Sequence, residues 1–126
     1  MKMAKKILVV EDDESTTNLL ELWLTNMGHE VICSSDGYEG LKAAQRETPD
    51  LIILDVGLPK MNGFKVCRLL KYDNKYKHIP IIMLTAQELE DSKQLGRDSG
   101  ADEYVFKSSC KHTLPALIKK HLKPAS

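Results

Sequence analysis

The chain has 126 residues, the size of one ordinary domain, so we expect a single domain over residues 1–126 with its core between about 6 and 122. Lys and Arg number 18, and so do Asp and Glu, which leaves no net charge to draw the chain toward nucleic acid or an acidic membrane surface. We therefore expect neither direct nucleic-acid binding nor membrane insertion.

The apolar runs are too short for a membrane span, since they reach four or five residues where a transmembrane helix needs about 20. The basic start of the chain leads straight into a strand-like run, without the apolar region and cleavage site of a signal peptide. Cys33, Cys67 and Cys110 are odd in number and widely spaced, which argues against a disulfide framework and a zinc site. We expect a cytoplasmic protein with reduced thiols.

Five short apolar runs predict β-strands. They cover residues 7–10, 31–33, 51–54, 79–84 and 104–106. Three of them are apolar at every position, a pattern typical of strands that are covered on both faces of a parallel sheet. Helices should therefore lie on both sides of the sheet.

The segment after the first run has the spacing of a helix. Its apolar residues recur at positions i, i+3, i+4 and i+7, as Leu20, Trp23, Leu24 and Met27. Ser15 or Thr16 can begin this helix. Gly28 can end it, because a helix C-terminus favours a residue with positive φ.

Three further helices are expected before the last strand. The second begins at Asp36, whose partner Glu39 makes a capping-box-like start, and it ends before the proline at position 49. Asn62 can cap the third helix. Its inward side chains are expected to be Val66, Leu69 and Leu70. The fourth, at about 87–97, has few apolar residues and should be short.

The last helix carries apolar residues at helical spacing between Leu114 and Leu122, and Pro115 is compatible with it only in the first turn. The chain thus alternates strand and helix throughout. This order predicts an α/β fold, a doubly wound five-stranded parallel sheet with five helices. We expect the flavodoxin-like strand order 2-1-3-4-5.

Charged and polar side chains follow four of the five predicted strands. They are Glu11, Asp12 and Asp13 after the first strand, Asp55 after the third, Thr85 after the fourth and Lys107 after the fifth. In a sheet of this kind the ligand site lies beyond the carboxyl ends of the strands, where the strand order reverses. We therefore expect these side chains to lie near one another.

Carboxylates clustered at Glu11, Asp12 and Asp55 repel one another and should raise at least one pKa unless a cation neutralises them. Oxygen ligands favour Mg²⁺ or Mn²⁺, which also pair with phosphate oxygens. A hydroxyl at Thr85 and an ammonium at Lys107 supply the donor and the positive charge that a transferring phosphoryl group needs. Asp55 then remains as the nucleophile.

Four motifs resemble the receiver domains of bacterial two-component response regulators, of the chemotaxis-regulator type. They are residues 7–13 (ILVVEDD), 55–63 (DVGLPKMNG), 82–86 (IMLTA) and 100–107 (GADEYVFK). Their order and spacing are family-like, and the resemblance covers nearly the whole chain. It implies a cytoplasmic signalling switch in a phosphorelay, a Mg²⁺-dependent phosphoacceptor rather than an enzyme.

The resemblance also implies roles for single residues of the acidic cluster. Asp55 would accept the phosphoryl group from a histidine kinase or a histidine phosphotransfer protein. Asp12, Asp55 and the backbone carbonyl of Gly57 would bind the metal directly, and Glu11 would bind it through water.

The remaining implied roles concern the readout of the phosphoryl group. Thr85 and Lys107 would contact its oxygens, and Tyr104 would be the switch aromatic. The downstream protein target would bind the face made by the helix at 87–97, the strand at 104–106 and the last helix.

Two positions depart from the family pattern. Ser108 stands where the family usually has a proline in a cis peptide bond, and Gly57 stands where many relatives have a side chain. A cis bond before a non-proline residue costs about 2.5–4 kcal/mol, so either Lys107 is placed differently or the domain carries that strain. This departure leaves an alternative open, a pseudo-receiver that keeps the fold for protein contacts and is not phosphorylated. A phosphohydrolase of the haloacid-dehalogenase type would need a second aspartate at position 57.

Overall fold

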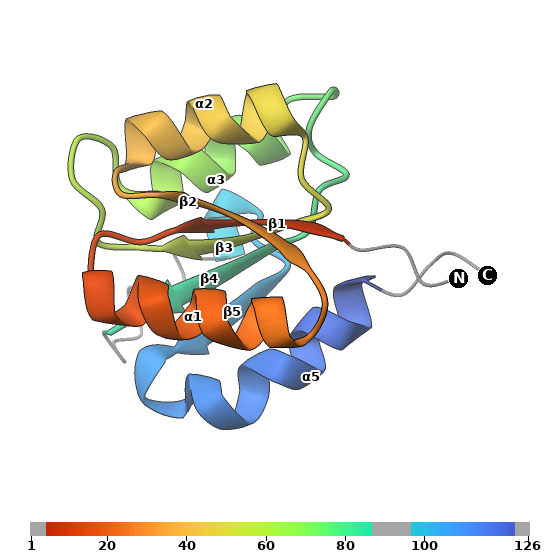
Figure 1. The fold of residues 1–126 in the computed structure, drawn as a ribbon. Coiled ribbons are helices and arrows are strands. Elements are labelled where there is room, and N and C mark those ends of the chain that lie inside the picture. The colour runs from red at the N-terminus through yellow and green to blue at the C-terminus, as the bar shows by residue number, and fades with distance from the viewer. Residues whose placement is uncertain (1–4, 87–96, 123–126) are drawn as a thin grey trace.

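Five parallel strands form one sheet in a computed structural model that describes residues 5–86 and 97–122 (Figure 1). The strands are β1 (Lys6–Val10), β2 (Glu30–Ser34), β3 (Leu51–Asp55), β4 (Ile81–Thr85) and β5 (Glu103–Phe106). Their order is β2-β1-β3-β4-β5, and every neighbouring pair is parallel. This confirms the predicted flavodoxin-like topology.

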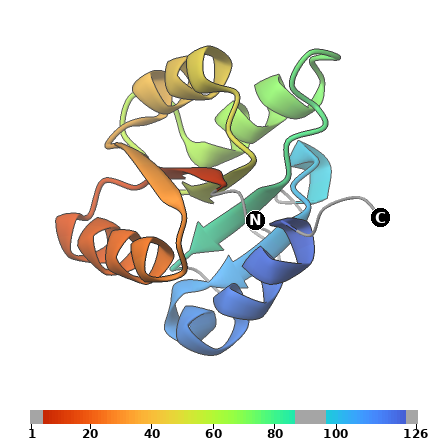
Figure 2. The same cartoon turned by 45° about the vertical axis from the view of Figure 1, so that its right-hand side comes forward.

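Helices cover both faces of the sheet. On one face lie α1 (Glu14–Asn26) and α5 (Cys110–Leu122), and on the other α2 (Gly37–Glu47) and α3 (Gly63–Lys71), as Figures 1 and 2 show. A short 3₁₀ helix, η1 (Lys107–Ser109), leads directly into α5. The helix expected at 87–97 falls outside the described residues except at its last position. No helix in the described part of the chain is long and apolar enough to cross a membrane.

The central strands are buried on both faces because alternate side chains enter two separate cores. Leu8 of β1 and Ile52 of β3 pack with α2 and α3, while Ile7 and Ile53 pack with α1 and α5. Each of these four side chains is almost fully buried. The unbroken apolar runs within β1, β3 and β4 therefore have the reason that the sequence predicted.

Side-chain caps begin three helices. Asp36 and Asn62 cap α2 and α3 as predicted, by accepting hydrogen bonds from Glu39 N (2.8 Å) and Lys65 N (3.0 Å). The predicted start of the first helix at Ser15 or Thr16 was wrong. Asp13 is the N-cap there, because its carboxylate accepts from Thr16 N at 3.0 Å and the helix begins one residue later.

Two further details of the helices differ from the prediction. Leu69 was expected to point inward but is 45% exposed, since the buried face of α3 is formed by Val66, Cys67 and Leu70. Pro115 lies well inside α5 and not in its first turn, because η1 allows the helix to begin at Cys110. The fourth strand also begins at Ile81 rather than at residue 79.

Candidate functional site

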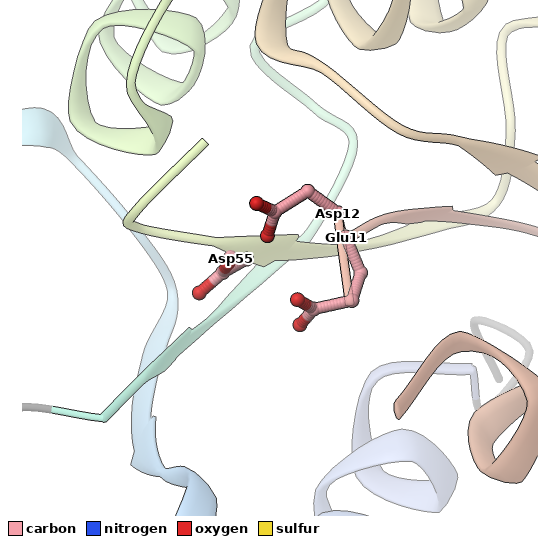
Figure 3. Close-up of side chains that lie close together, drawn as sticks. All are labelled: Glu11, Asp12 and Asp55. Carbon is pink, nitrogen blue, oxygen red and sulfur yellow. The ribbon is translucent and has the colours of Figure 1, made fainter. Parts of the chain in front are cut away.

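Three carboxylates gather at the carboxyl ends of β1 and β3. Glu11 and Asp12 directly follow β1, and Asp55 is the last residue of β3. One carboxylate oxygen from each lies within 4.8 Å of the others, as the close-up in Figure 3 illustrates. Glu11 and Asp55 are buried, whereas Asp12 is exposed. The parallel pairing of neighbouring strands β1 and β3 brings these ends together, as the sequence predicted.

Lys107 enters the same cluster from the end of β5. Its ammonium lies 3.0 Å from Oε2 and 3.2 Å from Oε1 of Glu11, and 3.3 Å from Oδ1 of Asp55. No described residue has a cis peptide bond, so the bond from Lys107 to Ser108 is trans. With Ser108 after it and a trans bond between them, Lys107 still contacts both Glu11 and Asp55.

The electrostatics of the cluster are dominated by burial and by the lysine. Burial raises the pKa of Glu11, and the charge of Asp55 adds a smaller upward contribution, although hydrogen bonds from Lys107 and Asp13 oppose both. The predicted rise of a carboxylate pKa is thus confirmed at Glu11, but desolvation contributes more than mutual repulsion. Burial alone would lower the pKa of Lys107, but its hydrogen bond to Glu11 and the charge of Asp55 raise it.

A second support fixes Glu11 from the side of α1. Its Oε1 accepts a hydrogen bond from Asp13 N at 3.1 Å, and its backbone carbonyl accepts one from the Thr17 hydroxyl at 3.3 Å. The sequence interpretation also missed that the side chain of Asp13 caps α1. The signal that could have revealed the cap is that an aspartate is at least as good an N-cap as serine or threonine.

The segment from 56 to 62, which follows Asp55, is anchored at Val56 and is open at Gly57. Val56 N donates to Leu84 O at 3.0 Å, and Gly63 N donates to Val56 O at 2.9 Å. A Cβ atom on Gly63 would overlap the carbonyl oxygen of Asp55. Nothing lies within 4 Å of the place where a Cβ of Gly57 would be, so there is open space at this residue, two positions after Asp55.

Thr85 and Tyr104 lie on the neighbouring strands. Thr85 is the last residue of β4 and is buried, at the same sheet edge as Asp55. Tyr104 packs against the core on the side of α2 and α3, and its ring meets that of Phe106 edge-on with centroids 6.0 Å apart. The hydroxyl oxygen of Tyr104 is buried and has no hydrogen-bond partner among the described residues.

The donor set fits a small divalent cation. Three carboxylates close to one another supply oxygen atoms, and Gly57, two residues after Asp55, has open space at its Cβ position. Hard oxygen ligands with space left for water suit Mg²⁺ or Mn²⁺. Asp12 and Asp55 could hold the ion directly, and Glu11 is shared with Lys107.

Comparison with known proteins agrees with this geometry. The family model for the response regulator receiver domain matches residues 7–119. The alkaline phosphatase synthesis transcriptional regulatory protein PhoP of Bacillus subtilis (strain 168) is 46% identical over 121 residues, which are 96% of this chain. The chain spans about half the length of that relative, 50%.

Two solved structures share the fold. The chemotaxis response regulator CheY4 of Vibrio cholerae has a TM-score of 0.86 and 33% identity, with 95% of this chain and 100% of that chain covered. The receiver domain of the sensor histidine kinase PA1611 from Pseudomonas aeruginosa PAO1 has a TM-score of 0.85 and 26% identity, with 94% and 97% covered. A magnesium ion is coordinated in the active-site cleft of the latter.

Proposed function

The chain belongs to the family of response regulator receiver domains, and from this premise we propose that it is a switch that accepts a phosphoryl group on Asp55 in a two-component phosphorelay. Receiver domains are phosphoacceptor regulators of two-component signalling. The observation that carries the proposal is the position of Asp55, whose Oδ1 lies 3.3 Å from the Lys107 ammonium and whose carboxylate adjoins Glu11 and Asp12. We place the switch in a single receiver domain over residues 1–126, in the cytoplasm.

In the proposed transfer, a carboxylate oxygen of Asp55 attacks the phosphorus of a phosphohistidine on a kinase or phosphotransfer protein. The bond from phosphorus to the imidazole nitrogen breaks, the imidazole leaves with the electron pair, and Asp55 becomes an acyl phosphate. Lys107 is close enough to balance the charge of the incoming phosphoryl oxygens, and the Thr85 hydroxyl would donate a hydrogen bond to one of them.

Asp12, Asp55 and the carbonyl of Gly57 would hold the metal directly, and Glu11 would act through water. Bound Mg²⁺ or Mn²⁺ would neutralise the carboxylates and the phosphoryl oxygens. The magnesium ion in the active-site cleft of the PA1611 receiver domain supports a metal at this site by similarity.

Readout of the phosphoryl group is assigned to Thr85 and Tyr104. A phosphoryl group carries about 1.5–2 negative charges and would draw the Thr85 hydroxyl toward Asp55. Tyr104 is only partly buried at the edge of the core, so its ring can change position without opening the sheet. The downstream protein would bind the face made by the helix expected at 87–97, β5 and α5, and neither nucleic acid nor membrane would be a direct partner.

The alternative of a pseudo-receiver rested on Ser108. Because Lys107 contacts both Glu11 and Asp55 across a trans bond, the serine no longer favours that alternative. The lysine and the acidic cluster together support phosphorylation instead.

Incubation with acetyl phosphate and Mg²⁺, followed by intact-protein mass measurement, tests the function. The parent chain should gain one phosphoryl group, Asp55→Asn should gain none, and the control Asp73→Asn, just beyond the C-terminal end of α3, should behave as the parent. An unlabelled parent would support the pseudo-receiver. Equal labelling of the parent and Asp55→Asn would show that another residue accepts the phosphoryl group.

A further inference from the structure

The first residue of α2 and the segment 56–62 approach each other so closely that no side chain fits between them. A Cβ atom built on Gly37 would overlap the carbonyl oxygen of Met61 and lie 2.6 Å from its carbonyl carbon, where ordinary contact begins at 3.4 Å. The obstacle is backbone, which cannot turn away as a side chain can. Gly37 has no positive φ, so the close approach alone is what requires a glycine here.

Two polar contacts tie the same parts together. Gly37 N donates a hydrogen bond to Pro59 O at 3.2 Å. The ammonium of Lys60 lies 3.6 Å from Oδ2 of Asp36, the buried N-cap of α2, and Lys60 has a left-handed backbone with φ of 67°. The start of α2 thus contacts three successive residues, Pro59, Lys60 and Met61.

These contacts bear on where Gly57 lies. The chain is held at Val56, whose N–H donates to Leu84 O and whose carbonyl accepts from Gly63 N, and again at residues 59–61 by the start of α2. Gly57 lies between these two supports and has no side chain of its own to hold it. The direction of its carbonyl therefore depends on where both supports place the chain.

We propose that Gly37 is a positioning residue for the metal site, because it lets α2 hold the segment 56–62 where the carbonyl of Gly57 faces the acidic cluster. This inference rests on the proposed function, in which that carbonyl is a metal ligand. Mg²⁺ demands near-ideal geometry at its ligands. A methyl group at position 37 must move Met61 away and displace the segment, so metal binding should weaken.

Titration with Mn²⁺, with the free ion measured by electron paramagnetic resonance, tests the inference on the whole chain. Outer contacts that orient metal ligands typically contribute about 10- to 100-fold to affinity, so Gly37→Ala should raise the Kd for Mn²⁺ by about that factor. Gly100→Ala is the matched control. It strains a glycine with φ of 87°, far from the cluster at the start of β5, and should leave the Kd within about twofold.

A measurement on the parent chain does not depend on whether Gly37→Ala folds. Coupling between metal and segment is reciprocal, so Mg²⁺ should slow hydrogen exchange at the amides of Gly37 and Met61, both of which donate to Pro59 O. Exchange at the Gly100 amide, which donates to Arg97 O, should not change.

The outcomes separate the two proposals. If the parent binds no Mn²⁺, the metal site itself is wrong and the inference falls with it. If the parent binds Mn²⁺ and either Gly37→Ala binds it equally well or Gly100→Ala loses as much affinity at equal stability, only the inference is overturned. Unchanged exchange at Gly37 in the presence of saturating Mg²⁺ would likewise overturn it.

Discussion

The ammonium of Lys107 lies 3.0 Å from Glu11 and 3.3 Å from Asp55, so one side chain bridges the carboxylates that end β1 and β3. Its charge therefore lies beside the carboxylates that would bind a divalent cation. Lys107 should therefore both stabilise the acidic cluster without metal and oppose metal binding.

Lys107→Met should accordingly bind Mn²⁺ more tightly than the parent. Removing a positive charge a few ångströms from a partly exposed cation site is worth on the order of 1 kcal/mol, about three- to tenfold in affinity. Lys111→Met removes a charge from the exposed side of α5 and should leave the affinity unchanged. Weaker binding by Lys107→Met would mean that the lysine orients the carboxylates more than it repels the ion.

Mg²⁺ should stabilise the fold, since the ligands are assembled only in the folded chain. At a concentration 100 times its Kd, a ligand specific for the folded state adds about 2.7 kcal/mol, enough to raise Tm by several degrees. Asp12→Asn should abolish the shift but hardly change Tm without metal, because Asp12 is exposed. Equal ionic strength from NaCl is the control, and an equal shift with NaCl would refute a specific site.

The order of the strands and the edge at which the site lies were predictable from short-range patterns. Unbroken apolar runs of four residues within β1, β3 and β4 indicate burial on both faces, and the parallel order places Glu11, Asp55 and Lys107 at one edge. It was harder to predict which of several neighbouring residues caps a helix. Asp13 displaced Ser15 and Thr16 as the N-cap because neighbouring residues offer the same hydrogen bond.

Contacts between parts of the chain that are distant in sequence could not be predicted from sequence patterns. The residues around Gly37 do not predict its close approach to the backbone of Met61. A glycine in the first turn of a helix can be there for other reasons. The trans bond before Ser108 could not be predicted from the sequence either. Whether Lys107 reaches Asp55 depends on the direction in which the chain passes from β5 into η1, and the spacing of residues does not determine that direction.

Asp102 lies away from the acidic cluster, and Asp102→Ala should lower the free energy of unfolding. Oδ2 of Asp102 lies 2.6 Å from the ammonium of Lys71, a side chain only 10% exposed, and accepts a hydrogen bond from Ile81 N at 2.8 Å. Its loss would leave a largely buried ammonium without its counter-ion and a strand N–H without an acceptor, at a cost of about 2–4 kcal/mol.

Urea unfolding of Asp102→Ala measures that cost, and Glu30→Ala, at the exposed start of β2, should stay within about 0.5 kcal/mol of the parent. Lys71→Met with Asp102→Ala should recover part of the loss, because the buried charge is then gone. A cost below 1 kcal/mol for Asp102→Ala would show that water replaces the carboxylate.

Glu103 should make stability depend on pH in the acid range. Its Oε2 lies 2.7 Å from Nε2 of His121 and 3.1 Å from the ammonium of Lys120, and the hydrogen bond from His121, with a further one from Lys120, lowers the pKa of Glu103 against the opposing effect of burial. The folded state therefore favours the ionised carboxylate. Its contribution to the free energy of unfolding is complete above the ordinary glutamate pKa of about 4.3 and is lost as the pH falls through the lowered value.

Glu103→Gln should consequently be less stable than the parent near neutral pH, by about 0.5–1 kcal/mol for pairs that stay partly exposed, and the difference should shrink toward zero in acid. Urea unfolding of both proteins between about pH 7 and pH 3 gives the comparison. Glu30→Gln, on the exposed edge strand, should show no such convergence. A difference that stays constant over this range would mean that the glutamine loses packing or a hydrogen bond and that the charge of Glu103 is not what fastens α5 to β5.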